Sequence, residues 1–321
     1  MYRQKKCIYL DQFAVSCLES ASDGTLWGEI KSKILTLYAQ NKIYCPLSCE
    51  HLLETSIRDR VHALAHNNFF EQISNNYIFY PVEIITSYEI SMYIRQGKIK
   101  KHMDGYLTKH RDNAMCSGNT YALAHAFSEE YKKNSQIQYA QLNDIHSINR
   151  KYPSVKQKER LLFAKAMRTL AIKKFVEELK KLYYNKRNIF EVSRYGNLSM
   201  CKSVDVIFYN LVNRRLFTRK DMELLISELE RNGFDNIPSL NIKNELSIIS
   251  ALDNKKTTSN DDIDISRAAS GLAFSDYFFT DSQRKMELVS LQFDKRYNTK
   301  IFSGKESDLQ NFILELEKLS E

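Results

Sequence analysis

The sequence contains little glycine and little proline. Its 321 residues include 9 glycines and 4 prolines. All-β sandwiches and barrels need turns rich in these residues about every 8–12 positions, and the chain has too few of them for such a fold. The sequence therefore predicts a protein that is mostly helical.

Long apolar runs are also missing. A membrane-spanning helix needs about 20 consecutive apolar residues, and the mean hydropathy of this chain is −0.45. The beginning, MYRQKKCIYLDQF, has an apolar run only at residues 7–10 before it reaches an acid, whereas the apolar part of a signal peptide has about 7–15 residues. These features predict a cytoplasmic protein that has no membrane partner.

The 6 cysteines have neither the spacing of zinc ligands nor that of a disulfide framework, because no two of them form a C-x-x-C pair. What the chain does have is a sizeable apolar content, with 43% hydrophobic and 12% aromatic residues, which is enough for a core. Lys and Arg exceed Asp and Glu by 47 to 39. This excess fits a polyanionic partner such as nucleic acid but does not require one.

Short apolar runs near both ends of the chain predict strands, at residues 7–10, 42–45, 77–80, 277–280 and 300–302. Helical spacing of apolar residues falls between and after them, at residues 27–38, 48–67, 264–274, 282–293 and 307–319. Strands that alternate with helices favour parallel βαβ units. We therefore predict an α/β fold in which both ends of the chain build one parallel sheet flanked by helices.

The middle of the chain has helical periodicity almost throughout. Residues 156–186 form a long amphipathic stretch, and Thr218 is followed three residues later by Asp221, a variant of the capping box that begins a helix. We predict an α/β domain made of residues 1–82 and 252–321, with residues 83–251 inserted into it as a large helical subdomain.

Acidic residues are expected at one edge of the predicted sheet. Asp11 and Asp281 each end a predicted strand, and the carboxyl ends of parallel strands share the edge at which open α/β sheets bind ligands. A helix that feeds the 277–280 strand begins at the same edge and carries Asp264. The helix after the second strand begins there too, with Glu50 in its first turn and Glu54 one turn further on. Asp276, at the start of a strand, belongs at the opposite edge.

Carboxylates that gather in one place repel one another, and a hard divalent cation such as Mg²⁺ or Mn²⁺ neutralises them with oxygen ligands. Such an ion can activate water for phosphodiester cleavage. The expected ligands are Asp11, Glu54, Asp264 and Asp281, with Glu50 and Asp261 as second choices. The same acids could also be ordinary helix caps.

Three segments resemble PIN-domain (PilT N-terminus-like) nucleases. In NDDIDISRAASGLAFSDYFFTDSQRKMEL an acid opens a helix, small residues follow, and a strand ends in Thr280-Asp281. IYLDQFAVS resembles the opening strand of that family, which ends in Asp11, and PLSCEHLLETS resembles its segment with the helix acid. The resemblance covers about residues 10–65 and 255–305. Gln12 departs from the common Thr or Ser and is similar to a subgroup with Leu-Asp-Gln at the first strand, which favours Glu54 over Glu50.

This resemblance implies a PIN-like fold and a metal-dependent endoribonuclease. Its substrate would be single-stranded or structured RNA in preference to DNA, its cofactor Mg²⁺ or Mn²⁺, and its catalytic residues Asp11, Glu54, Asp264 and Asp281. For the helical insertion we predict nucleic-acid binding, because a single-stranded channel combines cations with aromatic rings. The lysines chosen are Lys173, Lys174, Lys180 and Lys181. Glu177 and Glu178 lie among them, as they would on an ordinary solvated helix face.

Two other functions remain open from the sequence. One is a catalytically inactive PIN-like module for nucleic-acid binding or assembly. The other is a metal-free HEPN-type ribonuclease, suggested by the spacing of Arg60 and His66, although residues six apart do not share a helix face well. The sequence also leaves open a protein partner or an oligomer.

Overall fold

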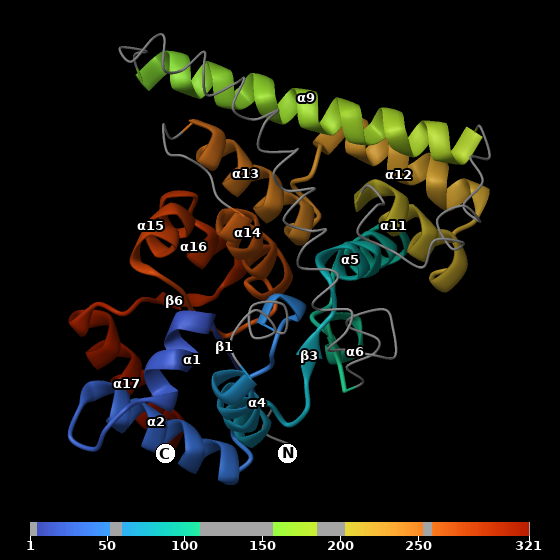
Figure 1. The fold of residues 1–321 in the computed structure, drawn as a ribbon. Helices are drawn as coiled ribbons and strands as arrows, with labels where there is room; N and C mark the ends of the chain where they lie inside the picture. The colour runs from blue at the N-terminus through green and yellow to red at the C-terminus, as the bar shows by residue number, and fades with distance from the viewer. Residues whose placement is uncertain (1–4, 52–59, 110–156, 185–202, 253–258, 321) are drawn as a thin grey trace. The chain divides into compact units, whose positions relative to one another are not determined.

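The computed structural model describes residues 5–51, 60–109, 157–184, 203–252 and 259–320. The chain divides into two compact units (Figure 1). Unit 1 contains the described residues of 1–80, 107–125 and 270–321, and unit 2 those of 81–106 and 126–269. The first change of unit, after residue 80, lies close to the predicted boundary at 82/83, and the last, after residue 269, lies inside a helix rather than at 251/252.

Unit 1 is built on a four-stranded parallel sheet with the strand order β2-β1-β5-β6. The strands are β1 (Lys6–Leu10), β2 (Ile43–Tyr44), β5 (Tyr277–Phe279) and β6 (Lys300–Phe302). The two central strands come from opposite ends of the chain and pair in the register Leu10 with Phe279. This confirms the predicted parallel sheet made from both ends.

Helices flank this sheet, as predicted. They are α1 (Gln12–Glu19), α2 (Leu26–Ala39), α4 (Arg60–Ser74), α15 (Ser282–Ser290), α16 (Phe293–Tyr297) and α17 (Glu306–Ser320). Thr25 begins α2 because its hydroxyl accepts a hydrogen bond from the Gly28 amide at 3.0 Å. The helix expected at 282–293 is interrupted after Ser290, where Gln292 has a φ of +56° and a short separate helix follows.

Alternate residues of the central strands face opposite sides of the sheet. Ile8, Leu10 and Phe279 belong to the apolar core that α1, α2, α4 and α17 complete. On the other side Tyr9 stacks on Phe278, with ring centroids 4.7 Å apart. Gly271 lies against this pair, and a Cβ there would be 3.0 Å from Tyr9 Cδ2. Because both faces of these strands are buried, residues 7–10 and 277–279 are apolar without a polar residue between them.

The strand predicted at 77–80 does not extend the parallel sheet. It is β3 (Ile78–Phe79), which pairs antiparallel with β4 (Leu107–Thr108) in a sheet of its own. β3 is tied to the rest of unit 1 by an isolated parallel bridge between Leu47 and Ile78. The sequence analysis did not predict β4.

Unit 2 is helical in the residues that the structure describes. Its elements are α5 (Val82–Gln96), α6 (Met103–Tyr106), α9 (Gln157–Tyr184), α11 (Ser203–Tyr209), the π-helical turn η2 (Asn210–Arg214), α12 (Arg219–Asn232), α13 (Pro238–Leu252) and most of α14 (Ser259–Gly271). The capping box of Thr218 and Asp221 begins α12, as predicted, and Gly233 ends it with a φ of +61°. Among the described helices, none is both long and apolar enough to cross a bilayer.

A buried carboxyl joins three helices of unit 2. Glu89 on α5 accepts hydrogen bonds from the Tyr106 hydroxyl at 2.9 Å and from the Ser239 amide and hydroxyl at 2.8 and 2.6 Å. Its side chain is inaccessible to solvent. Burial raises the pKa of Glu89 to about 7, against the opposing effect of these hydrogen bonds. A group in the core of unit 2 therefore changes its charge near neutral pH.

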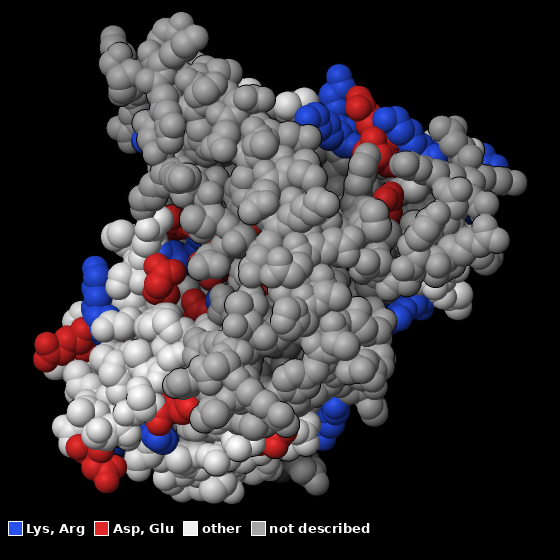
Figure 2. All heavy atoms as spheres, in the orientation of Figure 1, with Lys and Arg blue, Asp and Glu red and all other residues white. Residues whose placement is uncertain are grey.

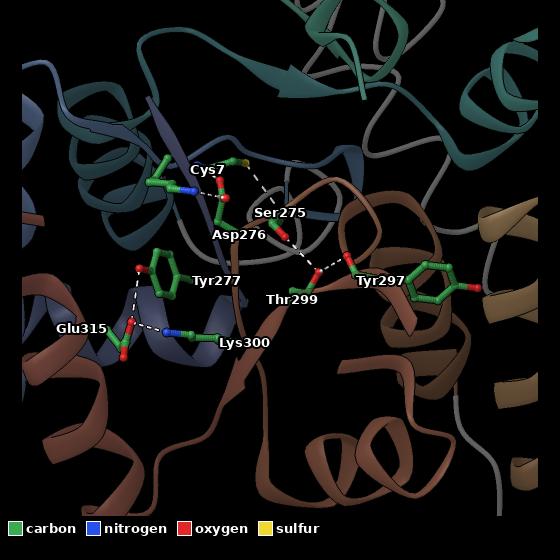
Figure 3. A network of polar contacts seen from close by, with 9 residues as sticks. Cys7, Ser275, Asp276, Tyr277, Tyr297, Thr299, Lys300 and Glu315 are labelled. Atoms are coloured by element: carbon green, nitrogen blue, oxygen red, sulfur yellow. Dashed lines mark hydrogen bonds and ion pairs between the residues drawn. The ribbon is translucent and has the colours of Figure 1, made fainter. Parts of the chain in front are cut away.

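The amino-terminal edge of the parallel sheet is closed by a polar network (Figure 3). Asp276 accepts hydrogen bonds from Lys6 Nζ at 2.7 Å and from the Cys7 amide at 2.9 Å. The Thr299 hydroxyl donates to the Ser275 carbonyl at 2.9 Å. Asp276 thus lies at the start of β5, opposite the edge that Asp11 occupies, as predicted, and it fastens β1 to β5.

Candidate functional site

Asp11 lies where the central strand β1 ends and helix α1 begins. Its amide donates to the Phe279 carbonyl at 3.0 Å, so the backbone is still paired with β5 at this point. Its Oδ1 accepts from the Gln12 amide at 2.6 Å, which makes Asp11 the N-cap of α1. The residue is 6% exposed. The backbone of Asp11 is therefore held by β5, and its carboxylate is held by the amide of the next residue.

Asp281 occupies the equivalent place on the neighbouring strand. It follows β5 after Thr280 and caps α15, with Oδ1 accepting from the amides of Gln283 at 2.8 Å and Arg284 at 3.0 Å. Because β1 and β5 are parallel neighbours, Asp11 and Asp281 both lie at the carboxyl edge of the sheet. This confirms the predicted placement of these two acids.

Thr280 connects the two strand ends. Its amide donates to the Phe302 carbonyl at 3.0 Å, and its hydroxyl donates to Asp11 Oδ2 at 3.3 Å. Thr280 is buried, and its hydroxyl has a single proton, which it directs at the Asp11 carboxylate. The Thr-Asp pair at the end of β5 therefore contributes a carboxylate from Asp281 and an orienting hydroxyl from Thr280.

Both carboxylates lie at helix N-termini. Hard oxygen donors of this kind suit Mg²⁺ or Mn²⁺. The chemistry of the donor pair therefore fits a divalent cation.

His51 is a buried histidine that was not among the predicted site residues, and it holds the end of β1 at the same edge of the sheet. His51 Nδ1 accepts from the Ser48 amide at 2.9 Å, so the proton is on Nε2, which donates to the Leu10 carbonyl at 2.8 Å. The Ser48 hydroxyl also contacts Nδ1 at 2.9 Å and is bonded in turn to the Tyr9 hydroxyl at 3.1 Å. His51 thus holds the peptide immediately before Asp11.

The signal for His51 was present in the sequence. Ser48 precedes a helix that begins at Cys49, and His51 lies three residues after this cap, where a capping box has Glu or Gln. Its imidazole accepts from the N-cap amide, as a Glu or Gln side chain would. The Ser-x-x-His pattern, taken as a capping box, predicts the hydrogen bond from the Ser48 amide to His51 Nδ1. The bond from His51 Nε2 to the Leu10 carbonyl depends on the fold, which brings these two groups together.

Replacing His51 by Ala should destabilise unit 1 by about 1–3 kcal/mol, because the Leu10 carbonyl and the Ser48 amide lose their buried partner. The His51→Gln variant should lose less, since Gln can keep the bond to the Ser48 amide. Urea unfolding followed by circular dichroism measures both. His102→Ala is the matched control, because the His102 side chain is 69% exposed, and it should leave the midpoint unchanged.

The choice between Glu50 and Glu54 is not settled by the structure. Glu50 is 5% exposed and lies in the first turn of the helix that begins at Cys49, as expected. Glu54 lies in residues 52–59, outside the described part of the chain. Glu54 as the preferred ligand and Glu50 as the second choice therefore stay predictions.

The helix expected to begin at Asp264 begins earlier. α14 starts at Ser259, so Asp261 and Asp262 are the acids of its first turn and Asp264 lies in its second turn. The prediction of Asp264 at the helix N-terminus is wrong, because the short acids before it already suit the positive end of the helix dipole. Asp264 Oδ1 instead pairs with Nη1 of the buried Arg267 at 3.1 Å.

The fourfold ligand set remains a prediction. Asp11 and Asp281 belong to unit 1, Asp264 and Asp261 belong to unit 2, and Glu54 lies outside the described residues. Across the described ranges, no three His, Cys, Asp or Glu residues form a group that could hold a metal ion. What the structure does bring together is the pair at the ends of β1 and β5.

The four lysines predicted to bind nucleic acid lie on α9 with acids around them. Lys180 Nζ contacts Glu230 Oε1 at 2.6 Å, and Lys181 Nζ contacts Glu178 Oε1 at 3.1 Å. Lys173 Nζ is 4.0 Å from Glu177 Oε1. Figure 2 shows basic and acidic side chains interspersed over α9 and α12. The face is therefore mixed in charge, and its role in binding stays a prediction.

The metal-free alternative rests on Arg60 and His66. Both lie on α4, six residues apart, which does not place them on a common helix face. Their side chains lie outside what the structure describes.

No protein-family model, curated protein or solved structure matches this chain. The resemblance to PIN-domain nucleases therefore remains an interpretation of the motifs.

Proposed function

We propose that the protein is a metal-dependent endoribonuclease of the PIN-like type. Asp11 and Asp281, with Glu54 and Asp264, would hold Mg²⁺ or Mn²⁺, and RNA would be the substrate. The observation that carries the proposal is the position of Asp11 and Asp281 at the carboxyl ends of adjacent parallel strands. Three chain segments whose acids follow the order of that family add weight to it.

The roles of the described residues follow from their contacts. Asp11 and Asp281 would supply carboxylate oxygens, and Thr280 would orient Asp11 through its hydroxyl. His51 would hold the strand end that carries Asp11. When bound, the divalent ion would activate water and stabilise the charge on phosphate oxygens during cleavage.

The purified protein should cleave labelled single-stranded RNA when Mn²⁺ or Mg²⁺ is present, and the cleavage should stop when EDTA is added. A denaturing gel resolves the products. Single-stranded DNA of the same sequence is the control and should be cleaved less. RNA that is bound but not cut under any metal condition would contradict the enzyme and favour the inactive binding module. Cleavage that continues in EDTA would favour metal-free chemistry.

Changing Lys173, Lys174, Lys180 and Lys181 together to Gln should weaken RNA binding more than it slows cleavage at saturating RNA. For every lysine that neutralises a phosphate, the substitution should flatten the dependence of log K on log salt by about 0.7 for a single strand. Fluorescence anisotropy at several salt concentrations measures this slope. An unchanged slope would show that these lysines, three of which already lie near glutamates, are only a solvated face.

A further inference from the structure

β6 is the last strand of the parallel sheet. In the order β2-β1-β5-β6 it pairs with β5 alone among the strands that the structure describes. The Lys300 amide donates to the Asp276 carbonyl, and the Phe302 carbonyl accepts from the Thr280 amide, both at 3.0 Å. Lys300 and Phe302 therefore direct their backbone groups at β5. Because successive strand residues direct these groups to opposite sides, the amide and carbonyl of Ile301 point away from β5, toward the edge of the sheet.

These two backbone groups of Ile301 have no partner in the part of the chain that the structure describes. The ladder with β5 uses the neighbouring residues instead, and no turn, loop or side chain among the described residues bonds to Ile301. The residue is nevertheless only 7% exposed, so water reaches little of it. An unpaired backbone group that is shielded from water costs about as much free energy as a lost hydrogen bond. A further strand beside β6 would remove this cost.

A groove lies along this edge of the sheet. It has a volume of about 640 Å³ and is lined by β6 and by residues of α15, α16 and α17. α15 and α16 lie on one side of β6, and α17 lies on the other (Figure 1). Val289 on α15 is 41% exposed, Leu314 on α17 is 52% exposed, and both line the groove. A strand laid beside β6 has side chains that point alternately to the two faces, so it meets an apolar group on each.

The charge of the groove is positive. Its charged lining residues are Lys285, Lys295, Lys300, Lys318, Asp294 and Glu315. Glu315 is shared by Lys300 at 2.5 Å and Lys318 at 2.7 Å. Lys285 pairs with Asp308 at 2.6 Å. Even with Asp308 counted, lysines outnumber acids, and the groove therefore complements an acidic partner.

Lysine is also a residue that natural edge strands use to prevent unwanted pairing. Lys300, the lysine of β6, does not serve this purpose well, because its Nζ is bound to Glu315 of α17 (Figure 3). Its charge is therefore held toward the helix that covers one face of the sheet. The backbone of Ile301 stays accessible from the groove that it lines.

We propose that the edge of β6 binds an extended acidic segment of a partner protein, which adds a fifth strand to the four-stranded sheet. The Ile301 amide donates to this segment, and the Ile301 carbonyl accepts from it. Apolar side chains of the segment pack on Val289 and Leu314, and carboxylates next to them meet Lys295 and Lys318. In binding of this kind, main-chain hydrogen bonds give affinity and alternate side chains give specificity.

The backbone of Ile301 favours a peptide over a nucleic acid. A peptide strand offers both an amide and a carbonyl to it, whereas a phosphate group has acceptor oxygens only and cannot donate to the Ile301 carbonyl. This binding does not depend on the proposed nuclease activity.

Fluorescence anisotropy on the full chain tests the proposal, with the labelled peptide Glu-Glu-Val-Val-Glu-Glu as the probe. This peptide should bind saturably. Methylation of the two valine amide nitrogens removes the donors needed for strand pairing but keeps every charge, and it should weaken binding at least tenfold. The peptide Lys-Lys-Val-Val-Lys-Lys, with reversed charge, should not bind.

Variants of the chain test the same contacts from the other side. Ile301→Pro lacks the outward amide, and edge strands tolerate proline at such a position. Ile301→Ala is its matched control, because both lose the isoleucine side chain and only Pro loses the amide. Ile301→Pro should bind the peptide at least tenfold more weakly than Ile301→Ala. Circular dichroism shows whether each variant is folded, and the methylated peptide tests the strand pairing independently of that outcome.

The charge of the groove is tested at Lys295, which is exposed on α16. Lys295→Glu should weaken peptide binding about fivefold, because an exposed attraction becomes a repulsion. Lys220→Glu is the control, since Lys220 is exposed on α12 of unit 2 and does not line the groove. It should leave the affinity unchanged.

The proposal is wrong if the acidic peptide does not bind saturably, if methylation leaves its affinity unchanged, or if folded Ile301→Pro binds it as tightly as Ile301→Ala. Equal effects of Lys295→Glu and Lys220→Glu would also contradict it. Displacement of the peptide by inorganic phosphate or by single-stranded RNA at constant ionic strength would overturn it in favour of a site for phosphate groups.

Discussion

Asp11→Asn and Asp281→Asn should each lower metal-dependent RNA cleavage by more than about 100-fold. Asn removes the negative charge that would hold the ion, whose contribution to catalysis is several kcal/mol, with each 1.4 kcal/mol worth about tenfold. The fold should survive, because Asn is as good an N-cap as Asp for α1 and α15. Initial rates at several Mn²⁺ concentrations measure the loss.

The control for these variants is Asp276→Asn at the opposite edge of the same sheet. Asp276 pairs with Lys6 and the Cys7 amide, so its replacement should cost some stability but leave the rate of the folded protein unchanged. If Asp11→Asn and Asp281→Asn keep full activity while their unfolding midpoints match the unmodified chain, the carboxylate site is wrong. Equal loss in all three variants would point to unfolding rather than chemistry.

The free energy of unfolding should fall by about 3 kcal/mol between pH 5 and pH 8 because Glu89 loses its proton over this range. Its pKa is raised to about 7 in the fold by burial, from 4.5 for an unperturbed Glu. A raised pKa means that the folded state binds the proton more tightly, so the contribution is present below pH 4.5 and is lost as pH rises through about 7. Glu89→Gln cannot titrate, and Gln can still bond to Tyr106 and Ser239.

The difference between the unmodified chain and Glu89→Gln, measured by urea unfolding at each pH, isolates this effect. Glu83 on the same helix is the control. Burial raises its pKa, but Lys243 and Ser203 outweigh that effect and leave the pKa lowered. Its contribution is therefore lost only as pH falls below 4.5, and Glu83→Gln should not change the slope between pH 5 and pH 8. Equal slopes for the unmodified chain and Glu89→Gln would contradict the Glu89 assignment.

The strands of the parallel sheet could be predicted because their signals are local. Residues 7–10 and 277–279 are short apolar runs, each followed directly by a polar residue, and β1 and β5 contain them. Asp11 and Asp281 followed directly, since the end of a parallel strand fixes the edge at which the next residue lies. The helix caps at Thr218 and Asp281 are likewise set by residues within one turn.

The beginning of α14 shows where local signals are ambiguous. The run NDDID contains several acids that suit a first helical turn. The helix was predicted to begin at Asp264, whereas α14 begins five residues earlier, at Ser259. The buried Arg267, which holds Asp264, depends on packing that no spacing along the chain reveals.

The sequence by itself determined the fold class, the parallel strands and the acids at their ends, because strand and helix signals come from neighbouring residues. Only the tertiary structure decided that β3 pairs with β4, that His51 Nε2 bonds to the Leu10 carbonyl, and that Glu89 is buried between Tyr106 and Ser239. Each of these contacts joins residues far apart in the chain. Their energies depend on burial and on distance in space, which local periodicity does not carry.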